Sequence, residues 1–364
     1  MFSYLRRIKT AFAYIRSQLK DPDALTYFPE APRKAGWQIR LDFLRWMVRH
    51  REMNHFYYVY GLDRKGARQR EYLANREFFT FRNSLNAPMD AAAQTGNHLL
   101  VLRDKFLFGQ YLTSLGFPTP RTIALCDDGM VYWMDTHRWD SLESVCGSGR
   151  EIDGFLKGLY GECGEAVSRI QVRQGRLLLN GREAGVEELR ESMKGQYIIQ
   201  ERIAQHATLA RLHPHSVNTI RLITIRTRQT TLPFSAGLRM GTRGNHRDNW
   251  ATGGLFACVD LASGRLGEEA FYKPGFGGRA RKHPDSGVIF ADVTVPHFRE
   301  AVDLAVSLHP LFHGVASIGW DIAIADEGPV FIEGNDNWEI SLHQAHEGGL
   351  REAFHRCVMG YDSV

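Results

Sequence analysis

Long hydrophobic runs are missing from this chain of 364 residues. Its uncharged apolar runs are short, such as Tyr197–Ile199, whereas a helix that crosses a membrane needs roughly 20 apolar residues. No compact apolar segment near the first residue resembles a secretory signal. The sequence therefore predicts a cytoplasmic protein without membrane-spanning helices.

Cysteine is also scarce, and its spacing is irregular. The five cysteines are odd in number and form no C-x-x-C pair, which argues against a disulfide framework and against a structural zinc site. They are Cys126, Cys146, Cys163, Cys258 and Cys357. Hydrophobic residues at 43% and charged residues at 24% are typical of a globular protein, and the length predicts two or three packed modules.

Acidic residues are absent from residues 1–20, which contain five Lys or Arg. Apolar side chains recur there at helical spacing and predict a basic amphipathic helix. They are Leu5, Ile8, Phe12, Ile15 and Leu19. Three interpretations remain open: a helix docked on the body of the protein, a helix lying on an anionic membrane surface, or a targeting peptide. Residues 1–100 carry 17 Lys and Arg against 9 Asp and Glu, so the front of the chain is basic.

The pattern of the sequence changes near residue 96. Residues 1–95 are predicted to be mainly helical, and the aromatic residues of 35–85 are interpreted as core rather than as a surface for nucleic-acid bases. From residue 96 onward short strands and helices alternate, and residues 240–249 are predicted to form an exposed loop. The segment Asn97–Val101 precedes a helix, and the predicted helices are Asp104–Leu115 and Phe298–Leu311. The predicted strands are Leu177–Leu179, Tyr197–Gln200, Thr219–Arg226, Leu255–Val259, Gly287–Phe290, Asp321–Ala325 and Val330–Glu333.

Two apolar strands joined by the turn Asp326–Gly328 predict a β-hairpin late in the chain. Asp321 stands at the start of the first strand, and Glu333 and Asn335 stand at the end of the second. Because Glu333 and Asn335 are two residues apart, they are expected to face the same side. Three oxygen ligands at one end of a hairpin suit Mg²⁺. The alternative is that these side chains are merely solvated at strand ends.

A lysine before a glycine-spaced loop predicts a phosphate-binding element. Lys157 is placed at the end of a short strand, and Gly161 and Gly164 follow it. Glycines let backbone N–H groups approach phosphate oxygens, and lysine supplies positive charge. The G-K-[ST] ending of a Walker loop is missing, so an ordinary hairpin turn is the alternative. Farther on, the strand Tyr197–Gln200 runs into a polar segment that could present backbone groups to an adenine.

In this order, these pieces resemble the ATP-grasp superfamily over about residues 97–345. The resemblance implies an α+β fold whose two lobes hold ATP within a domain at residues 96–364, with a nucleotide lobe at about 150–210 and a metal and catalytic lobe at about 211–345. It also implies ATP and Mg²⁺ as cofactors. The residues that it implies for the nucleotide are Lys105, Lys157, Gly161, Gly164, Gln200, Glu201 and Ile203, and those for the metal are Asp321, Glu333 and Asn335.

Further segments resemble the sugar-transfer-associated (alpha-L-glutamate-ligase-related) branch, which is linked to surface polysaccharide synthesis. They are Asn218–Arg221, Asp248-Asn249, Gly253-Gly254 and Gly319–Asp321. The resemblance implies that Arg221, with Arg239 as a second candidate, stabilises charge during catalysis. The chain departs from the family at Gly158, where proline is frequent. It also lacks an acid between residues 202 and 220 to hold ribose, for which Gln205 or His206 could substitute.

The resemblance implies an ATP-dependent ligase that activates a carboxylate as an acyl phosphate and couples it to an amine. A uronic acid or amino acid destined for a cell-surface glycan is the expected substrate class. The alternatives are a small-molecule kinase with the same site and a non-catalytic nucleotide-binding protein. The loop Lys273–Gly278 could close over the site or hold an anionic substrate, or be a simple surface turn. The expected partners are small molecules, not nucleic acids, with peripheral membrane contact through residues 1–20.

Overall fold

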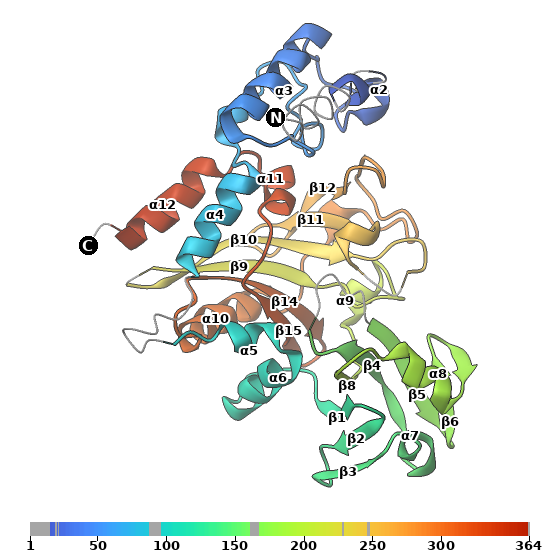
Figure 1. Ribbon diagram of the computed structural model, residues 1–364. Coiled ribbons are helices and arrows are strands. Elements are labelled where there is room, and N and C mark those ends of the chain that lie inside the picture. The colour runs from blue at the N-terminus through green and yellow to red at the C-terminus, as the bar shows by residue number, and fades with distance from the viewer. Residues whose placement is uncertain are drawn as a thin grey trace, which may run out of the picture.

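Two antiparallel sheets and a helical region follow one another along the molecule. Figure 1 shows the computed structural model, which describes residues 15–18, 20, 22–86, 96–160, 167–227, 229–245 and 248–362. The helical region lies at one end, a seven-stranded sheet in the middle and an eight-stranded sheet at the other end. Most of the predicted helix at residues 1–20 lies outside the described residues. Residues 15–18 are helical, and Ile15 is buried.

The eight-stranded sheet has the order β3-β2-β1-β8-β4-β5-β6-β7. Alternate residues of β4 are buried, because one face of the sheet packs against two short helices that contribute Val145 and Leu189 to its core. The strands are β1 (Thr122–Asp127), β2 (Met130–Trp133), β3 (Arg138–Ser141), β4 (Ile152–Gly158), β5 (Val167–Arg173), β6 (Arg176–Leu179), β7 (Arg182–Ala184) and β8 (Tyr197–Glu201), and the helices are α7 (Ser144–Gly147) and α8 (Val186–Ser192).

The seven-stranded sheet has the order β13-β12-β11-β10-β9-β14-β15. All nine residues of β14 are buried, because helices cover this part of the sheet on both faces. Helix α10 covers one face, and α4 and α12 cover the other through Phe78 and Phe354. The strands are β9 (Ile220–Arg226), β10 (Thr231–Met240), β11 (Leu255–Val259), β12 (Leu266–Tyr272), β13 (Arg279–Ala280), β14 (Ser317–Ala325) and β15 (Gly328–Asn335).

The helical region is joined by polar contacts to the segment of chain that follows the last strand of the middle sheet. The Gln344 side chain accepts from the Leu73 backbone N–H at 2.7 Å, and the Arg351 guanidinium pairs with Glu77. The remaining elements are α2 (Pro22–Leu25), α3 (Gly36–His50), η1 (Gln69–Glu71), α4 (Asn75–Leu85), α5 (Leu99–Arg103), α6 (Lys105–Ser114), α9 (Ala207–Ala210), η2 (Trp250–Thr252), η3 (Phe290–Asp292), α10 (Phe298–Leu308), η4 (His309–Leu311), α11 (Ser341–Glu347) and α12 (Arg351–Asp362).

Aromatic residues of the helical region form its core, in agreement with the interpretation of residues 35–85. The buried members include Phe43, Trp46, Tyr57, Tyr58 and Tyr60. Helices account for only part of this segment, because residues 51–68 form turns between α3 and η1. Trp37 differs from the other aromatics of α3, since its side chain is 66% exposed.

Several predicted elements differ from the structure. Residues 287–290 form no strand: Ile289 makes one isolated bridge, and the buried Phe290 begins the turn η3. Residues 240–242 are buried rather than exposed, because the Thr242 hydroxyl donates to the Gly253 carbonyl and holds this end of the loop inside. The boundary at residue 96 and the lobe limits stay predictions. The strands of the eight-stranded sheet begin at Thr122, well before the predicted nucleotide lobe.

Candidate active site

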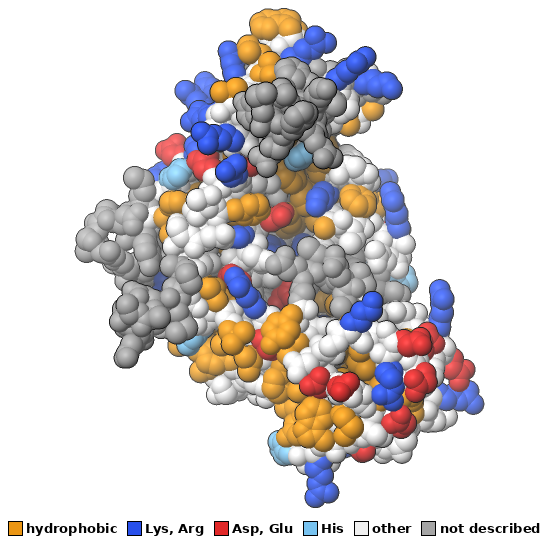
Figure 2. All heavy atoms as spheres, viewed as in Figure 1, with side chains coloured by type: hydrophobic (Ala, Val, Ile, Leu, Met, Phe, Trp, Pro, Cys, Tyr) orange, Lys and Arg blue, Asp and Glu red, His pale blue; other side chains and the backbone are white. Residues whose placement is uncertain are grey.

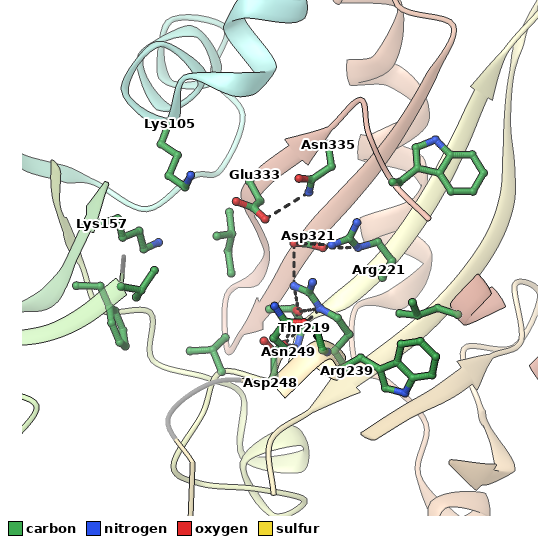
Figure 3. Close-up of a pocket in the computed structure, with 18 of the residues that line it drawn as sticks. Lys105, Lys157, Thr219, Arg221, Arg239, Asp248, Asn249, Asp321, Glu333 and Asn335 are labelled. Atoms are coloured by element: carbon green, nitrogen blue, oxygen red, sulfur yellow. Dashed lines mark hydrogen bonds and ion pairs between the residues drawn. The ribbon is translucent and has the colours of Figure 1, made fainter. Parts of the chain in front are cut away.

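A cavity of about 330 Å³ lies between the two sheets and collects most of the predicted site residues. Figure 3 shows Lys105 and Lys157 on one side of it, facing the hairpin β14–β15 across the cavity. Gln200 lies behind the wall, and Gly161 and Gly164 lie outside the described residues. The predicted residues that line the cavity are Lys105, Lys157, Glu201, Ile203, Arg221, Arg239, Asp321, Glu333 and Asn335.

Helix α6 positions Lys105 at its first residue. The Asp104 carboxylate caps the helix by accepting from the backbone N–H groups of Phe106 and Leu107, both at 2.9 Å. The Tyr160 hydroxyl donates to the other oxygen of the same carboxylate at 2.9 Å. This double fixation holds the start of α6 and with it the backbone of Lys105. Sequence reasoning missed the role of Asp104, although an aspartate directly before a helix is a recognisable cap signal.

Lys157 is a half-buried residue near the end of β4. Its ammonium donates to the Gln200 side-chain oxygen on the neighbouring strand β8 at 2.9 Å. Burial, opposed by the charge of Glu333 and assisted by the charge of Lys105, lowers the pKa of Lys157 to about 8. Gln200 therefore holds the lysine rather than lining the cavity itself.

A β-bulge sets the direction of the acidic side chains. In the pairing of β14 with β15, Asp321 lies opposite Glu333 but the next residue, Ile322, lies opposite Phe331. Ile332 is therefore an extra residue in β15, and the bulge reverses the facing of the strand beyond it. Phe331 points into the core under α10, whereas Glu333 and Asn335 point to the cavity.

Four neighbouring strands place charged side chains on the same face of the sheet. Their order is β10-β9-β14-β15, and the side chains are those of Arg239, Arg221, Asp321 and Glu333. Asp321 was predicted at the start of a strand but lies in the middle of β14, with only 1% of its side chain exposed. The charges are consequently gathered inside the sheet rather than at its rim.

Both arginines are paired with the buried carboxylate of Asp321. The Arg221 Nε atom lies 2.7 Å from Asp321 Oδ1, and an Arg239 Nη atom lies 2.8 Å from Asp321 Oδ2. The Thr219 hydroxyl accepts from Arg239 at 2.8 and 2.9 Å and donates to Asp248, which also accepts from the Thr219 backbone N–H at 3.0 Å. Thr219 and Asp248 thus orient Arg239, a role that the sequence did not reveal.

The two carboxyl groups of the site lie on residues that are paired across β14 and β15, and each affects the pKa of the other. Burial raises the pKa of Asp321 to about 7, although Arg221 and Arg239 act in the opposite direction. Burial alone would also raise the pKa of Glu333, but the hydrogen bond to Asp321 and the charges of Lys105 and the two arginines bring it down to about 2. Glu333 is therefore ionised throughout the neutral pH range.

The oxygen atoms present fit a hard cation in part. The Asn335 amide nitrogen donates to the Glu333 carboxylate and to the Gly319 carbonyl, both at 3.3 Å, which leaves its amide oxygen as the ligand atom. Glu333 and Asn335 thus supply two oxygens of the kind that Mg²⁺ prefers. Asp321 could join them only by sharing its carboxylate with the arginines. Of the three predicted metal ligands, Asp321 is the least suited to bind Mg²⁺, because its carboxylate is already paired with two arginines.

The two candidates for holding ribose have other tasks. The Gln205 side chain accepts from the Asn218 backbone N–H at 2.5 Å and donates to the Ser216 carbonyl at 3.3 Å. His206 caps α9 by accepting from the Thr208 backbone N–H at 3.1 Å. Neither side chain lines the cavity.

Lysines facing arginines and acids across a cavity between two sheets correspond to the site of an ATP-grasp protein. A family model described as sugar-transfer associated ATP-grasp matches residues 85–357, about three quarters of the chain, and the protein therefore belongs to that family. The predicted α+β ATP-grasp fold is confirmed. ATP and Mg²⁺ are the cofactors of ATP-grasp enzymes. No curated protein matches the chain significantly.

Several solved structures are distantly similar. N5-carboxyaminoimidazole synthase from Aspergillus clavatus is 11% identical, with a TM-score of 0.41, over 72% of this chain and 56% of that one. D-alanine-D-alanine ligase from Helicobacter pylori is 10% identical, with a TM-score of 0.41, over 73% and 60%. L-amino acid ligase from Bacillus licheniformis is 12% identical, with a TM-score of 0.40, over 75% and 48%. The chain spans about half the length of these proteins.

Proposed function

We propose that this protein is an ATP-dependent carboxylate–amine ligase that forms an amide through an acyl phosphate. The observation that supports the proposal is the grouping of two lysines, two arginines and an acidic hairpin around one cavity. Phosphoryl transfer depends mostly on positioning and on neutralising charge. Lysine and arginine side chains on the two sides of a cavity supply both the positioning and the positive charge.

The residues divide this work between them. Lys105 and Lys157 neutralise phosphate charge, and Glu201 and Ile203 lie where the adenine would enter. Glu333 and Asn335 would hold Mg²⁺, which when bound supplies further neutralisation of the phosphates. Arg221 and Arg239 stabilise charge that gathers as a substrate carboxylate oxygen attacks the γ-phosphorus and ADP leaves. Their pairing with Asp321 keeps both guanidinium groups oriented before substrate arrives.

The second half-reaction needs an amine and a site that excludes water. The amine nitrogen attacks the acyl carbon, inorganic phosphate leaves with its electron pair, and the nitrogen loses a proton. Lys273, at the start of the loop Lys273–Gly278, lines the cavity and could hold an anionic group of either substrate. Because an acyl phosphate hydrolyses in water, closure of the cavity during the reaction is required.

Measuring ADP release across pairs of acids and amines tests the proposal. A ligase releases ADP and phosphate only when both an acid and an amine are supplied. A stable phosphorylated product formed from one substrate alone would instead establish the kinase alternative. If the protein binds ATP but releases no ADP with any substrate pair, the non-catalytic alternative gains support.

A uronic acid or an amino acid used in surface polysaccharide synthesis is the substrate class that we propose. The support for it is the family description, which associates these proteins with sugar transfer. We place the reaction in the cytoplasm, at the inner face of the membrane, with residues 1–20 as a peripheral contact. The described residues include no helix that could span a bilayer. Uronic acids and amino acids with varied amines are therefore the first compounds to screen.

We expect the affinity for ATP to fall as the pH rises above about 8. Lys157 loses its charge in this range in the free protein, whereas a bound triphosphate favours the charged form, so binding takes up a proton. Affinity should drop about tenfold per pH unit until the pKa of the bound form is reached. Titration calorimetry between pH 7 and pH 10 measures the slope. The arginine of Lys157→Arg stays charged over this range, so the affinity of this variant for ATP should depend little on pH. Equal slopes in the two proteins would contradict the assignment of Lys157 to the phosphates.

A further inference from the structure

Helix α3 is apolar on two opposite sides. Its buried side packs into the aromatic core through Ile39, Phe43 and Trp46. At 3.6 residues per turn, four apolar residues form a stripe on the opposite side. They are Trp37, Leu41, Leu44 and Val48. Trp37 is 66% and Val48 76% exposed, so the two ends of the stripe reach the surface of the molecule. Leu41 and Leu44 between them are half-buried, and Leu44 also packs against the aromatic core. Large apolar side chains this exposed on one side of a helix can form a contact site.

Basic side chains border this stripe on both sides. They are Arg40, Arg45 and Arg49, and all three are exposed. Within the described part of the chain none of them forms an ion pair. The acid of α3, Asp42, lies away from the stripe and is bound by Lys34 at 2.8 Å. Figure 2 shows basic and hydrophobic side chains close together at this end of the molecule. Such a helix surface, with an exposed tryptophan, is typical of helices that lie in the headgroup region of a bilayer.

Charge distinguishes between the possible occupants of this surface. Residues 1–14 of the chain itself carry Arg6, Arg7 and Lys9 and no acid, so the arginines of α3 would repel them. A second copy of the protein would bring the same arginines. Only a surface with negative charges and an apolar layer beneath them is complementary both to the arginines and to the apolar stripe between them. An anionic lipid bilayer has both properties.

We propose that the outer surface of α3 docks on an anionic lipid membrane. Trp37 and Val48 enter the boundary between headgroups and acyl chains, while Arg40, Arg45 and Arg49 contact lipid phosphates. The surface lies at the opposite end of the molecule from the eight-stranded sheet (Figure 1), so docking leaves that sheet clear of the membrane. The proposal extends the contact beyond residues 1–20 and is independent of the ligase chemistry.

Flotation of the full-length protein with lipid vesicles tests the proposal. The protein should float with vesicles of phosphatidylglycerol and phosphatidylcholine, remain behind with phosphatidylcholine alone, and be released by high salt. Combined Arg40→Gln, Arg45→Gln and Arg49→Gln changes should weaken binding about 100-fold, roughly fivefold per arginine. Trp37→Ser with Val48→Ser should weaken it about tenfold.

A matched control removes the same charge elsewhere. Arg173, Arg176 and Arg182 are exposed residues of the eight-stranded sheet, and their combined change to Gln should leave flotation unchanged. Thermal unfolding checks that every variant is folded. Flotation of the α3 variants at the wild-type level would overturn the proposal, as would a wild-type protein that does not bind anionic vesicles. A deletion of residues 1–20 that abolishes binding while the α3 variants bind normally would overturn it as well.

Discussion

Replacing Glu333 by Gln should lower the rate of ADP release about 1000-fold while leaving the protein folded. Glutamine keeps the shape of the side chain and can still hydrogen-bond with Asn335, but it removes the negative charge that faces Lys105 and that a divalent cation requires. A coupled assay of ADP release at saturating ATP and Mg²⁺ measures the effect. Circular dichroism and thermal unfolding separate it from misfolding.

The same hairpin supplies the control for this experiment. Glu327 lies in the exposed turn between β14 and β15, remote from the cavity lining. Glu327→Gln therefore removes the same charge from the same hairpin and should keep full activity. Near-normal turnover in Glu333→Gln would show that the metal and the phosphates are held elsewhere.

Arg239→Met is expected to lower the free energy of unfolding by about 3 kcal/mol, because it leaves a buried carboxylate with one partner in place of two. The effect should depend on pH. The pKa of Asp321 already lies near 7, above its ordinary value of 3.8, and loss of Arg239 raises it further. When the pKa of a carboxyl group is higher in the folded than in the unfolded protein, the folded state loses stability as the pH rises from about 4 through the raised pKa.

Urea unfolding at pH 5 and at pH 8 measures this dependence. The destabilisation should be small at pH 5, where Asp321 is protonated, and clearly larger at pH 8, above the wild-type pKa of about 7. Adding Asp321→Asn to Arg239→Met removes the unpaired charge and should restore much of the stability without restoring ADP release. If the double variant is as unstable as the single variant at pH 8, the ion pair is not the cause of the loss.

The sequence allowed the components of the site to be predicted better than their arrangement. Lys157, Glu333 and Asn335 lie in local patterns that carry their own chemistry, and the structure places all three around the same cavity. The pairing of Asp321 with Arg221 and Arg239 brings together residues about 80 to 100 positions apart. Strand order decides such contacts, and no local pattern in the sequence encodes strand order.

The outer strands were equally hard to predict from the sequence. Strands β1 to β3 share a sheet with β8, yet some 60 residues separate them from it in the chain. Their alternation is short, and β3 is exposed at every residue, so hydrophobic periodicity gives little signal there. Residues 287–290 show the opposite case, because a strand was predicted where the structure has none. This apolar run has the composition of a strand, but it leads into a turn whose first residue, Phe290, is buried.

The extra residue in β15 lets two successive side chains, those of Ile332 and Glu333, line the cavity together. In an evenly alternating strand, one of the two would face the core beneath α10. Removing Ile332 would restore even alternation: Phe331 would stay opposite Ile322 and Glu333 opposite Asp321, so the acid would keep facing the cavity. Such a deletion would therefore take an apolar wall from the site and leave its carboxylate in place.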